Sequence, residues 1–104
     1  MKKLINDPDD VVEEMLDGMV QTYPDRLRRL EDTQVVVRAD GTPDGKVGIA
    51  TGGGSGHEPT HAGYIGDGML DGAAAGEVFT SPTADQLNEM VKACDAGEGV
   101  LCVV

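Results

Sequence analysis

The chain has 104 residues, a formal net charge of −11 at pH 7 and 15 glycines. This length suits one small domain, and the negative charge argues against nucleic acid or an anionic membrane as a partner. The N-terminus meets acidic residues before any long apolar stretch, and no run approaches membrane-spanning length. We therefore expect a cytoplasmic protein without a signal peptide.

The first predicted element is a helix near the N-terminus. Asp7 and Pro8 are typical of a helix cap followed by proline at the first helical position. The helix is expected to end at Tyr23, because Pro24 follows. Its apolar stripe consists of Val11, Val12, Met15, Leu16, Met19 and Val20. The charged segment 26–30 predicts a linker or a short helix.

The middle of the chain alternates between strand-like and turn-like segments. Residues 33–39 are rich in β-branched side chains and predict a strand, and residues 40–45 have the composition of a turn. Residues 46–50 predict a second strand that runs directly into a glycine loop. Pro59 is expected to open a helix to about Tyr64, and residues 73–78 predict another short strand.

Ser81 and Pro82 repeat the pattern of a cap followed by proline, so a second long helix is expected to begin there. Its predicted apolar stripe consists of Ala84, Leu87, Met90, Val91 and Cys94. A last strand is expected over residues 100–104. Cys94 and Cys102 lack the spacing of a metal or redox motif, which favours two small buried apolar residues.

Strands that alternate with helices predict an α/β fold, with a mostly parallel sheet flanked by helices. A parallel strand is normally buried and followed by an element that covers it. The expected strand at residues 100–104 therefore indicates that residues 1–104 are the N-terminal portion of a larger domain. The alternative is a complete domain that ends in a strand.

The most informative motif is the glycine-rich run over residues 51–59. Glycines let a backbone approach a ligand closely, and the N–H groups of Gly54, Ser55 and Gly56 would hold one of its oxygens. His57 would stand at a helix N-terminus, where the helix dipole keeps imidazole neutral and able to accept a proton. The alternative is a glycine turn with a capping histidine and no ligand.

Three familiar glycine motifs fail at His57. A P-loop requires lysine after its last glycine, and both the dinucleotide fingerprint and the nucleophile elbow require glycine at residue 57. Lys92 is the only basic residue after Val47, whereas a polyphosphate site normally contains a cation close to its loop. These observations favour a neutral polar ligand.

The segment from His57 to His61 also matches the zinc-protease pattern H-E-x-x-H. That chemistry requires both histidines on one helical face, which Pro59 and the upstream glycines oppose. A zinc hydrolase is thus a third hypothesis, and His61 is expected to be structural or partly exposed. Asp67 and Asp71 lie in a glycine-rich segment that is typical of a turn and lacks the spacing of a calcium loop.

Three segments closely resemble the substrate-binding subunit of dihydroxyacetone kinase (DhaK type): GGGSGHEP at 52–59, HAGYIGDGML at 61–70 and GEVFTSPT at 76–83. The resemblance implies a homodimer of longer chains, each with two α/β domains, that binds dihydroxyacetone and acts as a phosphotransferase in glycerol metabolism. It implies that Gly54, Ser55, Gly56 and His57 contact the ketose. It further implies that His57 hydrogen-bonds the ketose hydroxyl and accepts its proton during phosphoryl transfer.

The resemblance also implies that part of the site lies beyond residue 104. A histidine that binds the ketose covalently, a lysine and an aspartate are all expected downstream, so the 104 residues alone should be inactive. No metal or cofactor is expected on this chain. The donor would be ATP or an ADP-containing partner subunit of the nucleotide-binding DhaL type, with Mg²⁺. The alternative is a non-catalytic regulatory paralogue that senses dihydroxyacetone and binds a partner protein.

Overall fold

The N-terminal helix begins as the sequence predicts. The computed structural model describes residues 3–103, and in it the Asp7 carboxylate accepts a hydrogen bond of 2.9 Å from the Asp9 amide. A single 3₁₀ turn, η1 (Pro8–Asp10), leads into α1 (Val11–Thr22). Val12 and Leu16 are buried on the inner side of α1, which confirms the predicted apolar stripe.

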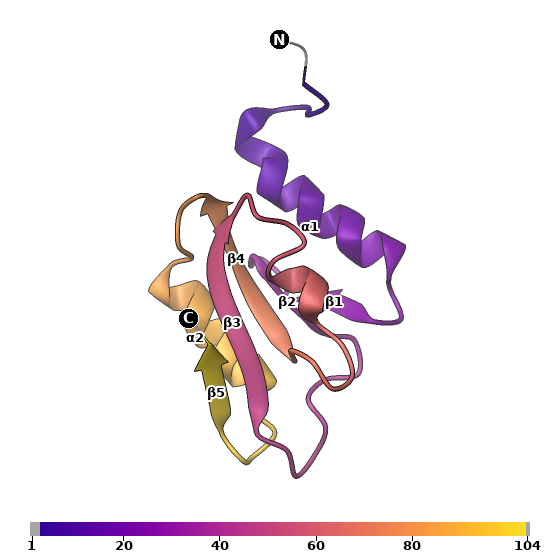
Figure 1. Cartoon of the computed structure of the whole chain (residues 1–104), viewed down its shortest axis with the longest axis vertical. Coiled ribbons are helices and arrows are strands. Elements are labelled where there is room, and N and C mark those ends of the chain that lie inside the picture. Colours follow the sequence, from indigo (N-terminus) through magenta and orange to yellow (C-terminus); the bar gives the residue numbers. More distant parts are fainter. Residues whose placement is uncertain (1–2, 104) are drawn as a thin grey trace.

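The described residues form a five-stranded sheet in the order β1-β2-β4-β3-β5 (Figure 1). Its strands are β1 (Leu27–Arg29), β2 (Val35–Arg38), β3 (Gly48–Ser55), β4 (Gly72–Val78) and β5 (Val100–Val103). The β4–β3 and β3–β5 pairs are parallel, and the β1–β2 and β2–β4 pairs are antiparallel. The α/β class is confirmed, with a sheet that is mixed rather than mostly parallel.

The antiparallel half of the sheet begins with residues 26–30, for which the prediction of a linker or short helix is wrong. Residues 26–30 form neither a linker nor a helix, because Leu27 pairs with Arg38 and begins β1. A short connection joins β1 to β2, and such a connection permits only antiparallel pairing. Leu27 is buried among the side chains under α1, which explains why this charged segment becomes a strand.

Helices cover both faces of the sheet. Helix α1 and the short 3₁₀ helix η2 (Ala62–Tyr64) lie over one face, and α2 (Ala84–Cys94) lies over the other (Figure 1). The three valines of β2 alternate between the faces: Val36 packs under α1, and Val35 and Val37 pack under α2. All three are buried, which is the pattern of a strand covered on both sides.

Helix α2 differs from its prediction in its cap. Thr83, not Ser81, is the N-cap, and its hydroxyl accepts a hydrogen bond of 3.2 Å from the Gln86 amide.

Cys94 is buried as expected, and burial raises the pKa of its thiol to about 11. Cys102 in β5 is exposed, so the prediction of two buried cysteines is wrong for this one. Val104, the last residue of the predicted strand, lies outside the described residues.

An ionic cluster joins β2, β3 and β4 at the end of the sheet opposite to the glycines. The Asp71 side chain is fully buried and accepts a hydrogen bond of 2.8 Å from the Ile49 amide. It also pairs with the Arg38 guanidinium at 3.4 Å and with the Lys46 ammonium. The residue that the sequence assigned to a turn therefore connects three strands.

Candidate functional site

The glycine-rich run lies where parallel strands end. Strands β3 and β4 are parallel, and Ser55 at the end of β3 stands beside Val78 at the end of β4. In open α/β sheets, ligands bind at the carboxyl ends of the parallel strands. Residues 56–61, which follow β3, therefore occupy the edge of the sheet at which a ligand is expected.

The glycines themselves are not a loop. Gly52, Gly53 and Gly54 belong to β3, so the predicted boundary between strand and glycine loop is wrong. A Cβ atom at Gly53 would lie 2.5 Å from His61 Cε1, and one at Gly54 would lie 2.7 Å from the Thr80 nitrogen. One at Gly56 would lie 2.9 Å from the Phe79 ring. The absent side chains thus make room for the chain's own neighbours.

Ser55 connects the ends of the two strands. It is buried, its hydroxyl donates a hydrogen bond of 2.8 Å to the Gly76 carbonyl, and its own carbonyl accepts one of 2.7 Å from the Phe79 amide. Its side chain and carbonyl thus hold the segment after β4 against the end of β3. The contact of the Ser55 amide with a ligand oxygen stays a prediction.

His57 lies on the surface at this edge, but its setting differs from the expectation. Residues 56–61 form bends and turns, so the helix predicted to begin at Pro59 is absent and only η2 follows. The argument that a helix dipole keeps the imidazole neutral is therefore wrong. Instead, the ring of His57 meets the ring of Phe79 edge to face, with centroids 5.2 Å apart and planes inclined by 69°.

Glu58 binds a backbone amide that the sequence assigns to a ligand. Its two carboxylate oxygens lie 3.3 and 3.1 Å from the Gly56 amide, which donates to them. One of the three amides assigned to a ligand oxygen is thus already bound by an acidic side chain. Because Glu58 is exposed, a ligand that displaced it would gain the Gly56 amide at little cost in packing.

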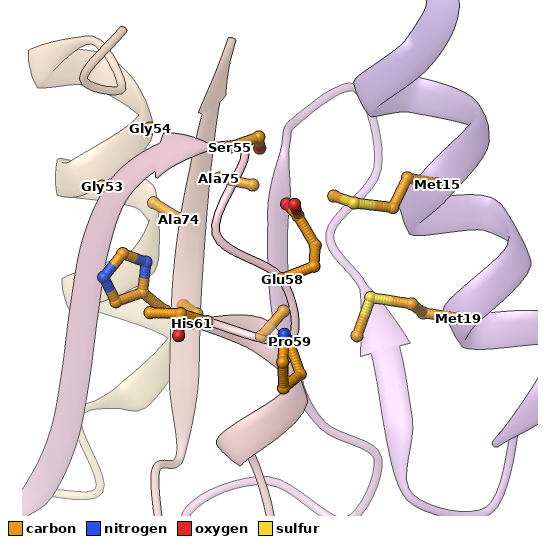
Figure 2. Close-up of a pocket in the computed structure, with 13 residues that line it drawn as sticks. Met15, Met19, Gly53, Gly54, Ser55, Glu58, Pro59, His61, Ala74 and Ala75 are labelled. Atoms are coloured by element: carbon orange, nitrogen blue, oxygen red, sulfur yellow. The ribbon is translucent and has the colours of Figure 1, made fainter. Parts of the chain in front are cut away.

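A small cavity lies beside these residues, between α1 and the sheet (Figure 2). Its lining includes Met15 and Met19 of α1, together with Glu58 and His61. Its volume is about 10 Å³, close to that of one water molecule, so it holds no larger ligand. His57 does not line it. A ligand at His57 would therefore lie outside this cavity.

The two histidines of the H-E-x-x-H match do not form the helical pair that a zinc protease requires. His61 is half-buried with its ring against Gly53, as its structural reading predicted, whereas His57 faces Phe79. The intervening residues form turns rather than a helix. Among residues 3–103, no group of three His, Cys, Asp or Glu side chains is arranged to hold a metal ion.

The close contact at Gly54 gives a testable prediction. Gly54→Ala would place a Cβ atom 2.7 Å from the nitrogen and 3.0 Å from the oxygen of Thr80, and neither backbone atom can move without displacing the connection to α2. We expect the free energy of unfolding to fall by about 1–3 kcal/mol in urea denaturation.

Gly18→Ala in α1 is the matched control. A Cβ atom at this position meets nothing within 4 Å, and alanine is the better helix former by roughly 1 kcal/mol. Gly18→Ala should therefore stabilise the protein. Equal stabilities of the two variants would contradict the packing described for Gly54.

Comparison with known protein families identifies the chain. The model of the Dak1 domain matches residues 17–104. The chain belongs to the Dak1 domain family. Over all 104 residues this Dak1 chain is 56% identical to PTS-dependent dihydroxyacetone kinase 1, dihydroxyacetone-binding subunit DhaK, of Listeria innocua, and it covers 31% of that protein. The Dak1 chain thus spans less than a third of the length of this relative.

Solved structures agree with this assignment. The Dak1 chain superposes on the dihydroxyacetone kinase of C. freundii in complex with AMP-PNP and Mg²⁺ with a TM-score of 0.91 and 37% identity, covering 99% of this chain and 20% of that one. It also superposes on the dihydroxyacetone kinase operon co-activator Dha-DhaQ with a TM-score of 0.81 and 38% identity, covering 88% and 28%. The same fold thus occurs in a kinase and in a co-activator.

Within residues 3–103, none of the helices has the length and apolar character needed to cross a bilayer.

Proposed function

We propose that this chain is the N-terminal part of a dihydroxyacetone kinase and binds dihydroxyacetone beside Gly54, Ser55, Gly56 and His57. One observation carries the proposal: 56% identity, over every residue of the chain, to a subunit whose name states that it binds dihydroxyacetone. The position of these residues at the carboxyl ends of β3 and β4 agrees with it. The ketose is uncharged, which suits a segment whose only basic residue after Val47 is Lys92.

His57 is the proton acceptor in this proposal. When a ketose hydroxyl attacks phosphorus, its oxygen must lose a proton, and a neutral imidazole within hydrogen-bond reach takes it. His57 is exposed at the strand ends and bears no ion pair among the described residues, so the ring is available to a ligand. His61 is less suited to this role because its ring packs against Gly53.

The phosphoryl donor belongs to another subunit or domain in this proposal. Donation requires a nucleotide and Mg²⁺, and among residues 3–103 no group of three His, Cys, Asp or Glu side chains is arranged to hold a metal ion. We therefore assign ATP, or a partner subunit that contains ADP, to a nucleotide-binding DhaL-type protein. A homodimeric, cytoplasmic full-length protein acting in glycerol metabolism completes the proposal.

The test uses the full-length protein that contains these residues. It is mixed with dihydroxyacetone and with either ATP or a nucleotide-binding subunit that carries a transferable phosphoryl group. Formation of dihydroxyacetone phosphate is followed by a coupled assay. We expect phosphorylation with one of the two donors and binding of the ketose by calorimetry without either. Absence of both binding and product would overturn the proposal.

The similarity to the co-activator Dha-DhaQ favours a second candidate function. In this alternative, the full-length protein binds dihydroxyacetone without phosphorylating it and regulates a partner protein. The same experiment separates the two candidates: ketose binding with no product from either donor supports the sensor, whereas turnover supports the kinase.

A further inference from the structure

Phe79 combines an exposed apolar ring with a strained backbone conformation. It is the only phenylalanine of the chain, and yet 70% of its surface is exposed at the start of the connection from β4 to α2. Its φ angle is +53°, a left-handed conformation that is rare for a bulky side chain and costs free energy. Strained residues of this kind persist where the surrounding structure fixes them, and they concentrate at functional sites.

Three contacts fix Phe79 against the end of β3. Its amide donates a hydrogen bond of 2.7 Å to the Ser55 carbonyl, and its ring lies so close to Gly56 that a Cβ atom there would be 2.9 Å away. The same ring then meets the imidazole of His57 edge to face, with centroids 5.2 Å apart. The backbone strain and the absent side chain at residue 56 both serve to bring these two rings together.

We propose that Phe79 is a positioning residue that holds the His57 imidazole in the orientation needed to accept the ketose proton; this inference rests on the proposed function. An exposed histidine on a turn otherwise samples several rotamers, and only some of them direct a ring nitrogen at a ligand. An aromatic neighbour in edge-to-face contact favours one of these orientations. Phe79 therefore acts through His57 and does not itself touch the reacting atoms.

The test is a double-mutant cycle in the full-length protein. Phe79→Gly removes the ring and also relieves the left-handed backbone, so the thermal midpoint should stay the same or rise. We nevertheless expect kcat/KM to fall about tenfold, the upper range for an aromatic pair. Phe79→Tyr keeps the ring and should stay within about twofold of the parent. Met69→Ala, at another exposed apolar residue, is the control without a ring contact to His57.

The coupling to His57 decides the inference. In a His57→Ala background, Phe79→Gly should cause no further loss, because no imidazole remains to be oriented. The ring-proton resonances of His57 should move in Phe79→Gly and stay in place in Phe79→Tyr, which reports the ring contact independently of activity. The inference would be overturned if Phe79→Gly lowered kcat/KM by the same factor in both backgrounds. Unchanged turnover in Phe79→Gly would also overturn it. Unchanged turnover in His57→Ala alone would instead overturn the proposed role of His57.

Discussion

Replacing His57 by alanine in the full-length protein is expected to lower turnover by about 10²–10⁴-fold, the usual contribution of a general base. The loss should fall mainly on kcat, since the substitution removes the proposed proton acceptor and leaves the backbone of residues 54–56 unchanged. His57→Asn, which keeps a hydrogen-bonding group but cannot accept the proton at neutral pH, should be nearly as slow. Coupled-assay rates and calorimetric ketose affinities, measured on the same preparations, separate a loss of turnover from a loss of ketose binding.

His61 supplies the control for this experiment. It is the only other histidine in the sequence, and its ring packs against Gly53 rather than facing the surface near Phe79. His61→Ala should reduce stability, because it opens a space beside β3, while folded protein retains most of its turnover. A larger catalytic loss in His61→Ala than in His57→Ala would reassign the proton acceptor. Unchanged turnover in His57→Ala would remove His57 from the mechanism.

Strong local patterns made several elements predictable. The three consecutive valines of β2 and the small apolar residues of β4 were read as strands, and both strands form the buried centre of the sheet. The stripe of α2 placed Met90 and Cys94 correctly against the sheet. In these segments local propensity and tertiary burial agree, so the sequence pattern alone was sufficient.

The glycines at the end of β3 are wrongly predicted to form a loop, because the contacts that require glycine there come from residues distant in sequence. Glycine has a low propensity for strands, so Gly52, Gly53 and Gly54 read as a loop. In the structure each leaves space for a different neighbour: the Leu87 side chain, the His61 ring and the Thr80 backbone, respectively. Pairing with Ala74 and Ala75 of β4 then holds Gly52 and Gly53 in the strand, and the register shifts at Gly54. None of these partners is adjacent in sequence.

The missing helix after His57 has a related explanation. A proline at residue 59 is compatible with a first helical turn, but Gly63, Gly66 and Gly68 follow within ten residues, and glycine is a poor helix former. Only the single 3₁₀ turn of η2 forms, closed by a hydrogen bond of 3.1 Å from the Tyr64 amide to the His61 carbonyl. The candidate site thus depends on contacts between the ends of two strands, and the pairing of His57 with Phe79, 22 residues apart in sequence, had no local signal.

The largest stability effect is expected at Asp71. Its carboxylate is fully buried with Arg38, Lys46 and the Ile49 amide around it, and removal of one partner from a buried ion pair typically costs about 3–5 kcal/mol. Asp71→Asn keeps the shape but leaves Lys46 without its carboxylate partner, and Arg38 retains only Asp40. We expect it to lower the free energy of unfolding by about 3 kcal/mol in urea at pH 7. Asp67→Asn, in the exposed part of the same glycine-rich segment, should change it by less than about 0.5 kcal/mol.

The pH dependence of the unfolding free energy is a second test of the same cluster. Burial alone would raise the pKa of Asp71, but the hydrogen bonds from Lys46 and Ile49, the charge of Lys46 and the hydrogen bond from Arg38 outweigh it, so the pKa lies below its ordinary value of 3.8. A lowered pKa in the folded state means that the unfolded state binds the proton first as pH falls. The stabilisation is therefore complete above the unfolded pKa and declines as the pH drops through it toward the folded value. The difference in unfolding free energy between the parent and Asp71→Asn should thus be constant from pH 7 to about 5 and shrink below about 4. A difference that stayed constant down to pH 3 would show that the Asp71 pKa is the same in the folded and unfolded states, and it would contradict stabilisation by charge pairing.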